Sequence, residues 1–258
     1  MTYTAYDGKL ARLCSAISSD LKSWIRLGPV FKATPFNETW SKSGSIITKQ
    51  FGSSFIAQLI RFDQNSGIPT DAPRFGMFFG DSSIFFAHAT EADLLSGFWT
   101  PVVDNNGNLK PVISWRAGYF DSSLTESGPP SMDRNGQTLL LYNGMNCDQN
   151  KTACPQGSYK DPSLPDRAYS SGQLLVNTSN PFLVINRLDD PFMTVTEQYE
   201  EKGNVDNVVF IEGLAFAGNQ FYLYYGCADT LVSVAVCNSP VCQSAGADTR
   251  EQSRRHLL

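Results

Sequence analysis

The chain has 258 residues, of which 41% are hydrophobic and 12% aromatic, and its formal net charge is -5. This length and apolar content are enough for a sizeable core in a single domain. The acidic balance argues against nucleic acid as a partner. No apolar run approaches the roughly 18 residues of a membrane span, so we expect no membrane partner either.

In chain order, four segments share one pattern: an apolar strand, a polar turn and a second apolar strand. They are residues 1–24, 75–99, 138–176 and 221–236, the third interrupted by a cysteine-bounded loop. No segment of helical length with a 3.6-residue period lies between them. Repeated antiparallel units of this kind predict an all-β fold, a β-propeller. A β-sandwich is the alternative.

Polar residues at equivalent turns favour the propeller over the sandwich. Asp7, Asp81 and Asp229 each fall in the turn of a repeat, and Asn143 takes this place in the interrupted repeat. In a propeller these turns converge on the central axis, where polar groups can line one pocket. A turn residue that only bonds its own backbone is the simpler explanation for each of them.

The cysteines suggest an oxidising compartment. Two pairs bracket short polar loops, Cys147 with Cys154 and Cys237 with Cys242. Both spacings suit small disulfide loops, whereas Cys14 and Cys227 lie in strand-like segments and are expected to be buried free thiols. We therefore expect a secreted or extracytoplasmic protein, with a cytoplasmic location as the alternative.

Histidine and tryptophan offer little for catalysis or metal binding. The chain has two histidines and no Cys-x-x-Cys motif, so we expect no metal site and no cofactor. His88 is expected to be a packed strand residue. The tryptophans are expected mostly in the core, with Trp115 as a candidate for stacking on a sugar.

A series of short motifs in fixed order carries a family resemblance from residue 3 to about residue 236. Among them are WSKSGSII (40–47), FFGDSSIFFAHA (78–89), YFDSSLTESGPP (119–130) and YYGCAD (224–229). This ordered set resembles glycoside hydrolase family 130, the β-mannoside phosphorylases and β-1,2-mannosidases. The resemblance implies a five-bladed β-propeller and a β-mannoside oligosaccharide or glycan as partner.

The resemblance also leads to expectations about the ends of the domain. The family's proton donor is an Asp in a Glu-Asp-Pro-Arg motif upstream of the first strand, and this chain does not contain that motif. We therefore expect residues 1–238 to form a propeller with an incomplete terminal blade. Residues 239–258 fit no blade and are expected to be a disordered tail.

The family motifs point to site residues. Asp229 resembles the acid that holds the sugar at the cleavage subsite, and Lys42 resembles a lysine placed at the sugar. Glu126 is the better candidate for activating water, and Glu212, an acid among apolar neighbours, is the second catalytic candidate. Further candidates for substrate binding are Asp7, Asp81, Asp121, Tyr142, Asn143 and Glu200.

The motif at residues 76–81 favours hydrolysis over phosphorolysis. Phosphorylases of the family carry a His-Arg pair here, whereas this chain has GMFFGD. An acid at this place would repel a phosphate dianion. The sequence therefore predicts a β-mannoside glycosidase whose activity is in doubt without the donor motif, and a carbohydrate-binding propeller without turnover as the alternative.

Overall fold

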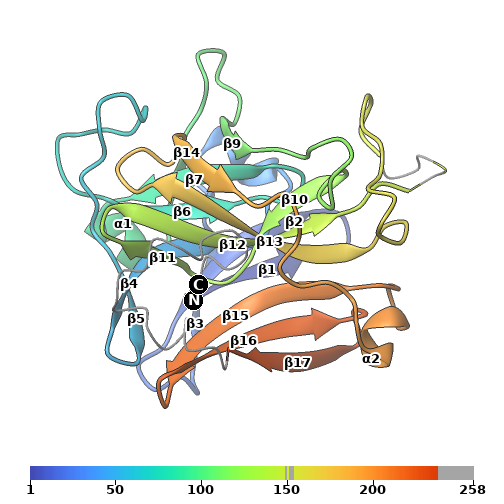
Figure 1. Ribbon diagram of the computed structural model, residues 1–258. Helices are drawn as coiled ribbons and strands as arrows, with labels where there is room; N and C mark the ends of the chain where they lie inside the picture. Colours follow the sequence, from blue (N-terminus) through green and yellow to red (C-terminus); the bar gives the residue numbers. More distant parts are fainter. Residues whose placement is uncertain (149, 151–153, 238–258) are drawn as a thin grey trace.

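The computed structural model describes residues 1–148, 150 and 154–237. The expected tail at 239–258, and the Cys242 end of the second cysteine pair, lie outside the described residues. The described chain is almost entirely β-structure, with sheets that curl around one another (Figure 1). The all-β prediction is confirmed.

The strands form four successive units. The first contains β1 (Thr2–Tyr6), β2 (Ala11–Ile17) and β3 (Ile25–Pro29). The second contains β4 (Ser45–Phe51), β5 (Ser54–Ala57), β6 (Phe75–Phe79), β7 (Ile84–Ala89), β8 (Thr100–Pro101) and β9 (Pro111–Ile113). The third contains β10 (Leu124–Ser127), β11 (Ser131–Arg134), β12 (Gln137–Met145), β13 (Tyr169–Asn177) and β14 (Val184–Arg187). The fourth contains β15 (Val209–Ala217), β16 (Gln220–Cys227) and β17 (Leu231–Val236).

Helices are short connections between these strands. They are the 3-10 helix η1 (Pro35–Glu38), α1 (Glu91–Ser96) and α2 (Gln198–Glu201). Helix α1 has clear local causes. Thr90 and Asp93 form a reciprocal capping box at its start, and Gly97 ends it in the left-handed conformation with φ 74°. None of the helices among the described residues is long and apolar enough to cross a membrane.

The four predicted repeats are antiparallel hairpins, namely β1–β2, β6–β7, β12–β13 and β16–β17. The first and fourth units are separate three-stranded sheets, whereas the second and third are joined through a parallel contact between β4 and β11. In Figure 1 the β15–β17 sheet lies below the sheet that holds β12 and β13, and β1–β3 lie behind them.

The prediction that Asn143 occupies a turn is wrong. Asp7, Asp81 and Asp229 do follow the first strand of their hairpins, but Asn143 lies inside β12. An Asn-Gly pair is a strong turn signal, yet β12 continues because β10 pairs with it on one side and β13 on the other. Gly144 is required there for a different reason, since a Cβ would lie 2.5 Å from Cβ of Asp121.

Three apolar clusters fill the space between and within the sheets. The largest includes Ile47, Phe78, Phe86, Leu140 and Leu174, the second includes Leu13, Phe31, Met77 and Trp99, and the third includes Leu141, Ile211 and Leu223. His88 is buried in β7, as expected. The tryptophan prediction holds for Trp99 but not for Trp24 and Trp40, which are exposed.

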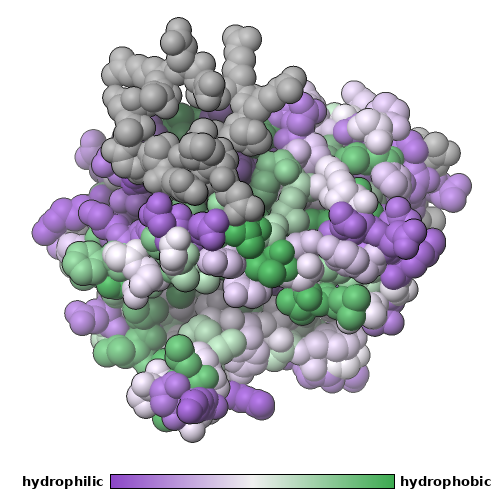
Figure 2. Space-filling view, turned by 60° about the horizontal axis from the view of Figure 1, so that its bottom comes forward, coloured by the Kyte–Doolittle hydropathy of each residue, from purple (hydrophilic) through white to green (hydrophobic). Residues whose placement is uncertain are grey.

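Some apolar side chains of the outer strands remain at the surface. They include Tyr224, Leu231, Val232, Val234 and Val236 of β16 and β17. Figure 2 brings this side of the molecule forward and shows apolar surface (green) among hydrophilic residues (purple). Strand β17 is the last strand of its sheet, so its outer edge has no neighbouring strand among the described residues.

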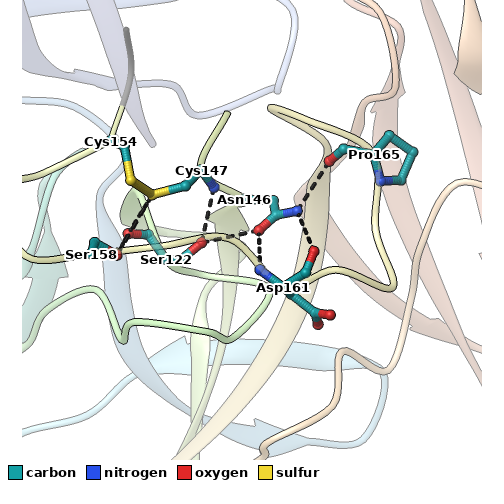
Figure 3. The surroundings of a disulfide bond; sticks show 7 residues. All are labelled: Ser122, Asn146, Cys147, Cys154, Ser158, Asp161 and Pro165. Atoms are coloured by element: carbon teal, nitrogen blue, oxygen red, sulfur yellow. Dashed lines mark hydrogen bonds between the residues drawn. A yellow bond between two sulfur atoms is a disulfide. The ribbon is translucent and has the colours of Figure 1, made fainter. Parts of the chain in front are cut away.

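The predicted disulfide between Cys147 and Cys154 is present, and Cys14 and Cys227 are buried free thiols as expected. Beside the disulfide, the Ser122 hydroxyl accepts a hydrogen bond from the Cys147 amide at 2.9 Å and donates one to Oδ1 of Asn146 at 3.0 Å (Figure 3). The Asn146 amide in turn donates to the carbonyls of Asp161 and Pro165 (Figure 3). The loop after β12 is thereby tied to the residue that follows Asp121.

Candidate active site

One cavity of about 400 Å³ brings together the first strands of three units and, from the third unit, the turn between β10 and β11. Its wall includes Thr2 to Thr4 of β1, Ile46 and Thr48 of β4, Gly128 between β10 and β11, and Glu212 of β15. The four units are therefore arranged around a common axial space. The convergence predicted for the repeated turns is not seen in this wall, because Asp7, Asp81, Asn143 and Asp229 do not line it and strand residues form most of it.

Lys42, Asp81 and Glu126 meet near this cavity. The Lys42 ammonium lies 3.5 Å from Oδ2 of Asp81, and neither side chain is fully exposed. The Ser43 hydroxyl lines the cavity and donates a 2.5 Å hydrogen bond to Oε1 of Glu126. Glu126 itself is 5% exposed. A cation, two carboxylates and a hydroxyl thus form one polar cluster at the end of strands β6 and β10.

The backbone around Lys42 is shaped by close packing. Ser43 has a positive φ of 47°, a conformation that few residues adopt without strain. At Gly44 a Cβ would approach the Met77 sulfur and the Thr2 hydroxyl to 3.0 Å. The small residues of the WSKSGSII motif therefore allow β1, β4 and β6 to approach one another, which holds Ser43 against Glu126.

Burial raises the pKa of Glu126 to about 7, and the negative charge of Asp81 adds to this, while Lys42 and the Ser43 hydrogen bond oppose it. The pKa of Glu212 is also raised to about 7, first by desolvation and then by the charge of Glu126, with Lys42 opposing. Solvent reaches Glu212 because it lines the cavity, but surrounding protein still removes much of its hydration. Two carboxyl groups that interact and titrate near neutral pH can serve as proton donor and acceptor.

Tyr169, at the start of β13, belongs to the same electrostatic neighbourhood and is not among the sequence-predicted site residues. Burial raises its pKa to about 12, together with the charges of Glu126, Asp229 and Asp81. Asp229 is exposed in the β16–β17 turn with a positive φ of 53°. The sequence held no signal that distinguishes Tyr169 from the other tyrosines, because its place depends on how β13 packs against neighbouring units.

Asp121 and Tyr142 are the buried members of a separate ionic cluster. Oδ2 of Asp121 lies 2.6 Å from Nη2 of Arg187 and 3.2 Å from Nη2 of Arg116, and it accepts a 2.7 Å hydrogen bond from the Tyr142 hydroxyl. Both Asp121 and Tyr142 have 0% exposure. Protein donors already engage this carboxylate, so its geometry is that of a structural group.

Asn143 and Glu200 also have internal partners. The Asn143 side chain accepts a hydrogen bond from the Ile211 amide and donates one to the Ile211 carbonyl, which links β12 to β15. Glu200 is 2% exposed and accepts hydrogen bonds from the Tyr225 hydroxyl and the Thr196 amide. Of the two acids Glu200 and Glu212, only Glu212 lines the cavity.

Asp7 is placed away from the cluster. Its Oδ1 accepts hydrogen bonds from the amides of Lys9 and Leu10, and its Oδ2 pairs with Arg12 at 2.7 Å. This is the simple turn-stabilising role that short acidic side chains often have. Of the ten predicted site residues, Glu212 lines the cavity, Lys42, Asp81 and Glu126 lie beside it, and Asn143 lies directly opposite Glu126 in the β10–β12 pair. Asp229 shares the electrostatic neighbourhood of Tyr169. The remaining four have other partners outside this cluster: Asp7, Asp121, Tyr142 and Glu200.

Comparisons with known proteins agree with this architecture. The family model described as β-1,4-mannooligosaccharide phosphorylase, of glycoside hydrolase family 130, matches residues 1–241. The chain belongs to glycoside hydrolase family 130. A 1,2-β-oligomannan phosphorylase of Thermoanaerobacter sp. (strain X514) is 24% identical to this family 130 chain over 240 residues, which cover 92% of it and 62% of the phosphorylase.

Solved structures give the same result for this family 130 chain. A structure described under "The GH130 family of mannoside phosphorylases contains glycoside hydrolases that target beta-1,2 mannosidic linkages in Candida mannan" has a TM-score of 0.79 and 35% identity, covering 93% of this chain and 61% of that one. A glycosyl hydrolase from Bacteroides ovatus has a TM-score of 0.78 and 35% identity, covering 92% and 60%. The chain thus spans about three fifths of the length of these relatives.

No group of three or more His, Cys, Asp or Glu side chains among the described residues could hold a metal ion.

The Asp121 cluster generates a stability prediction. Replacing Asp121 with Asn removes a buried charge that two arginines face, and we expect the free energy of unfolding to fall by about 3–5 kcal/mol. The matched control is Asp189→Asn, which removes an exposed partner of the same Arg116 and should cost about 0–1 kcal/mol. Urea unfolding followed by circular dichroism measures both. Equal effects of the two substitutions would contradict the structural role of Asp121.

The raised pKa of Glu126 generates a pH prediction. Because its folded pKa of about 7 exceeds the usual value of 4.5, the folded state holds this proton more tightly than the unfolded chain. The contribution of protonated Glu126 to the free energy of unfolding is therefore complete below about pH 4.5 and is lost as the pH rises through about 7. This decrease in the free energy of unfolding is on the order of 3 kcal/mol. We expect Glu126→Gln to lack it when urea unfolding is compared at pH 5 and pH 8. The control is Glu91→Gln at an exposed position, and an unchanged pH dependence in Glu126→Gln would show that Glu126 is ionised like an ordinary surface acid.

Proposed function

We propose that this protein acts on β-mannosides as a glycosidase. The observation that carries the proposal is the pair of interacting carboxyl groups, Glu126 and Glu212, with raised pKa values beside one axial cavity in a family 130 chain. Glycoside hydrolysis needs one carboxylic acid to protonate the leaving oxygen and one carboxylate to activate water. A coupled pair that titrates near neutral pH can supply both states.

In the proposed site, Asp229, Lys42 and Asp81 bind the sugar and Glu126 activates water. The ion pair of Lys42 and Asp81 presents a donor and an acceptor to neighbouring sugar hydroxyl groups. Glu212, which lines the cavity, is the second catalytic candidate. We further propose a five-bladed β-propeller with an incomplete terminal blade, which the four successive units of strands and the match to family 130 support. The disulfide supports a secreted or extracytoplasmic location.

Hydrolysis is proposed over phosphorolysis on electrostatic grounds. A phosphate dianion requires several cations, most often arginines that can bond it through two donors. In the described part of the chain, Arg116 and Arg187 are engaged by Asp121, and Lys42 faces Asp81, with Glu126 and Glu212 also within its field. The curated relative from Thermoanaerobacter is a phosphorylase, so phosphorolysis is the alternative activity. A carbohydrate-binding propeller without turnover is the alternative of another class.

The products from β-1,2-mannobiose test the proposal. We expect the 258-residue protein to release mannose at equal rates with and without inorganic phosphate. Glu126→Gln should lower this rate at least about 10²-fold, whereas Glu91→Gln should leave it unchanged. Mannose 1-phosphate that forms only with phosphate would overturn hydrolysis. Tight binding of the disaccharide without either product would favour the carbohydrate-binding alternative.

A further inference from the structure

Two aromatic rings are exposed beside the polar cluster. Trp40 is 44% exposed and Tyr6 is 64% exposed, and their ring centroids lie 6.1 Å apart at an angle of 58°. A large aromatic side chain that stays in water does not gain the free energy that burial of its apolar surface would provide. A pair of exposed rings beside the ion pair of Lys42 and Asp81 therefore suggests a surface that a ligand covers.

The backbone next to Trp40 is bound to strand β2. The neighbouring Ser41 is buried, its amide donates to the Ala11 carbonyl at 3.0 Å, and its hydroxyl accepts from the Leu13 amide at 3.1 Å. Tyr6, at the end of β1, pairs directly with Ala11. The backbone beside each ring is thus bound to the same strand, β2, which places the two rings close together.

The rings are continuous with the proposed site through Lys42. The Lys42 ammonium lies 5.8 Å from the Trp40 ring centroid and 3.5 Å from Oδ2 of Asp81. Trp40 and Lys42 are two residues apart, on either side of the inward-facing Ser41, and both side chains leave the backbone toward the same side. A ligand that contacts Lys42 can therefore also contact Trp40 and, beyond it, Tyr6.

A polar rim follows the rings on the outer side. Arg12 bonds Oδ2 of Asp7 and Oε2 of Glu38, each at 2.7 Å, and Asp7 directly follows Tyr6. Apolar rings flanked by carboxylates and a guanidinium match a pyranose, which presents C–H groups on its faces and hydroxyl groups around its edge.

The surroundings of Trp40 differ from those of the other exposed tryptophan. Trp24, which precedes β3, is 39% exposed, but among the described residues no aromatic ring or cation contacts its ring. Exposure alone therefore does not single out Trp40. The combination of a second ring, a fixed backbone and the Lys42 ammonium does.

We propose that Tyr6 and Trp40 form a sugar-stacking platform for the residue of a β-mannoside that follows the one bound at Lys42 and Asp81. This inference rests on the proposed function, because it assigns the same site a second sugar position. The platform selects glycans longer than a disaccharide. It contributes to binding and makes no contact with the reacting atoms.

Isothermal titration calorimetry with β-1,2-mannobiose and β-1,2-mannotetraose tests the platform. Trp40→Ala should weaken binding of the tetrasaccharide about 3- to 10-fold, the range for an aromatic stacking contact. Trp40→Phe, which keeps a ring, should retain most of the affinity. Binding of the disaccharide should change less than about 2-fold in either variant. Trp24→Ala is the matched control and should bind both glycans as the unsubstituted protein does.

The outcomes separate the platform from the function on which it rests. Unchanged binding of both glycans by Trp40→Ala overturns the platform and leaves the proposed function standing. An equal loss for the disaccharide and the tetrasaccharide also overturns it, because the ring would then act at the first sugar or on Lys42. If the unsubstituted protein binds neither glycan, the proposed function fails and the platform fails with it. Thermal melts of each variant establish that the compared proteins are folded.

Discussion

The cost of placing carboxylates inside the fold governs this structure. A buried carboxylate must be compensated by donors or cations, or it keeps its proton. Asp121 is fully compensated by two arginines and a tyrosine hydroxyl, and it joins β12, β14 and the loop before β10. Glu126, only five residues later, receives a serine hydroxyl and shares one lysine with other acids. The same physical constraint therefore yields a structural ion pair at one position and a titratable group at the other.

This difference explains why the sequence could not predict that Asp121, which the YFDSSLTESGPP motif suggested for substrate binding, is a structural group. Both precede the Gly-Pro-Pro turn, and both are buried. The partners that separate them come from distant segments: Arg187 lies 66 residues after Asp121, and Ser43 lies 83 residues before Glu126. Sequence patterns describe neighbours along the chain, whereas compensation of a buried charge depends on neighbours in space.

Much of the fold follows from local pattern. The repeated pattern of apolar strand, polar turn and second apolar strand predicts the four hairpins, and the spacing of Cys147 and Cys154 predicts their disulfide. The prediction for Asn143 was wrong because strand pairing on both sides of β12 outweighs the turn preference of Asn-Gly. The sequence could not predict the exposure of Trp40 either, because it depends on the contact of Ser41 with β2. Lys42 was proposed from the family resemblance of its motif, and Glu212 because an acid among apolar residues is unusual; the structure places both at or beside the cavity.

The central claim is that the axial cavity beside Lys42, Asp81 and Glu126 is where a β-mannoside binds. A crystal structure of the 258-residue protein in complex with β-1,2-mannobiose tests this most directly. The account predicts a mannose ring with hydroxyl groups within hydrogen-bonding distance of Lys42 and Asp81 and one edge directed at Glu126. A disaccharide bound at any other surface, with these three side chains uncontacted, would contradict it.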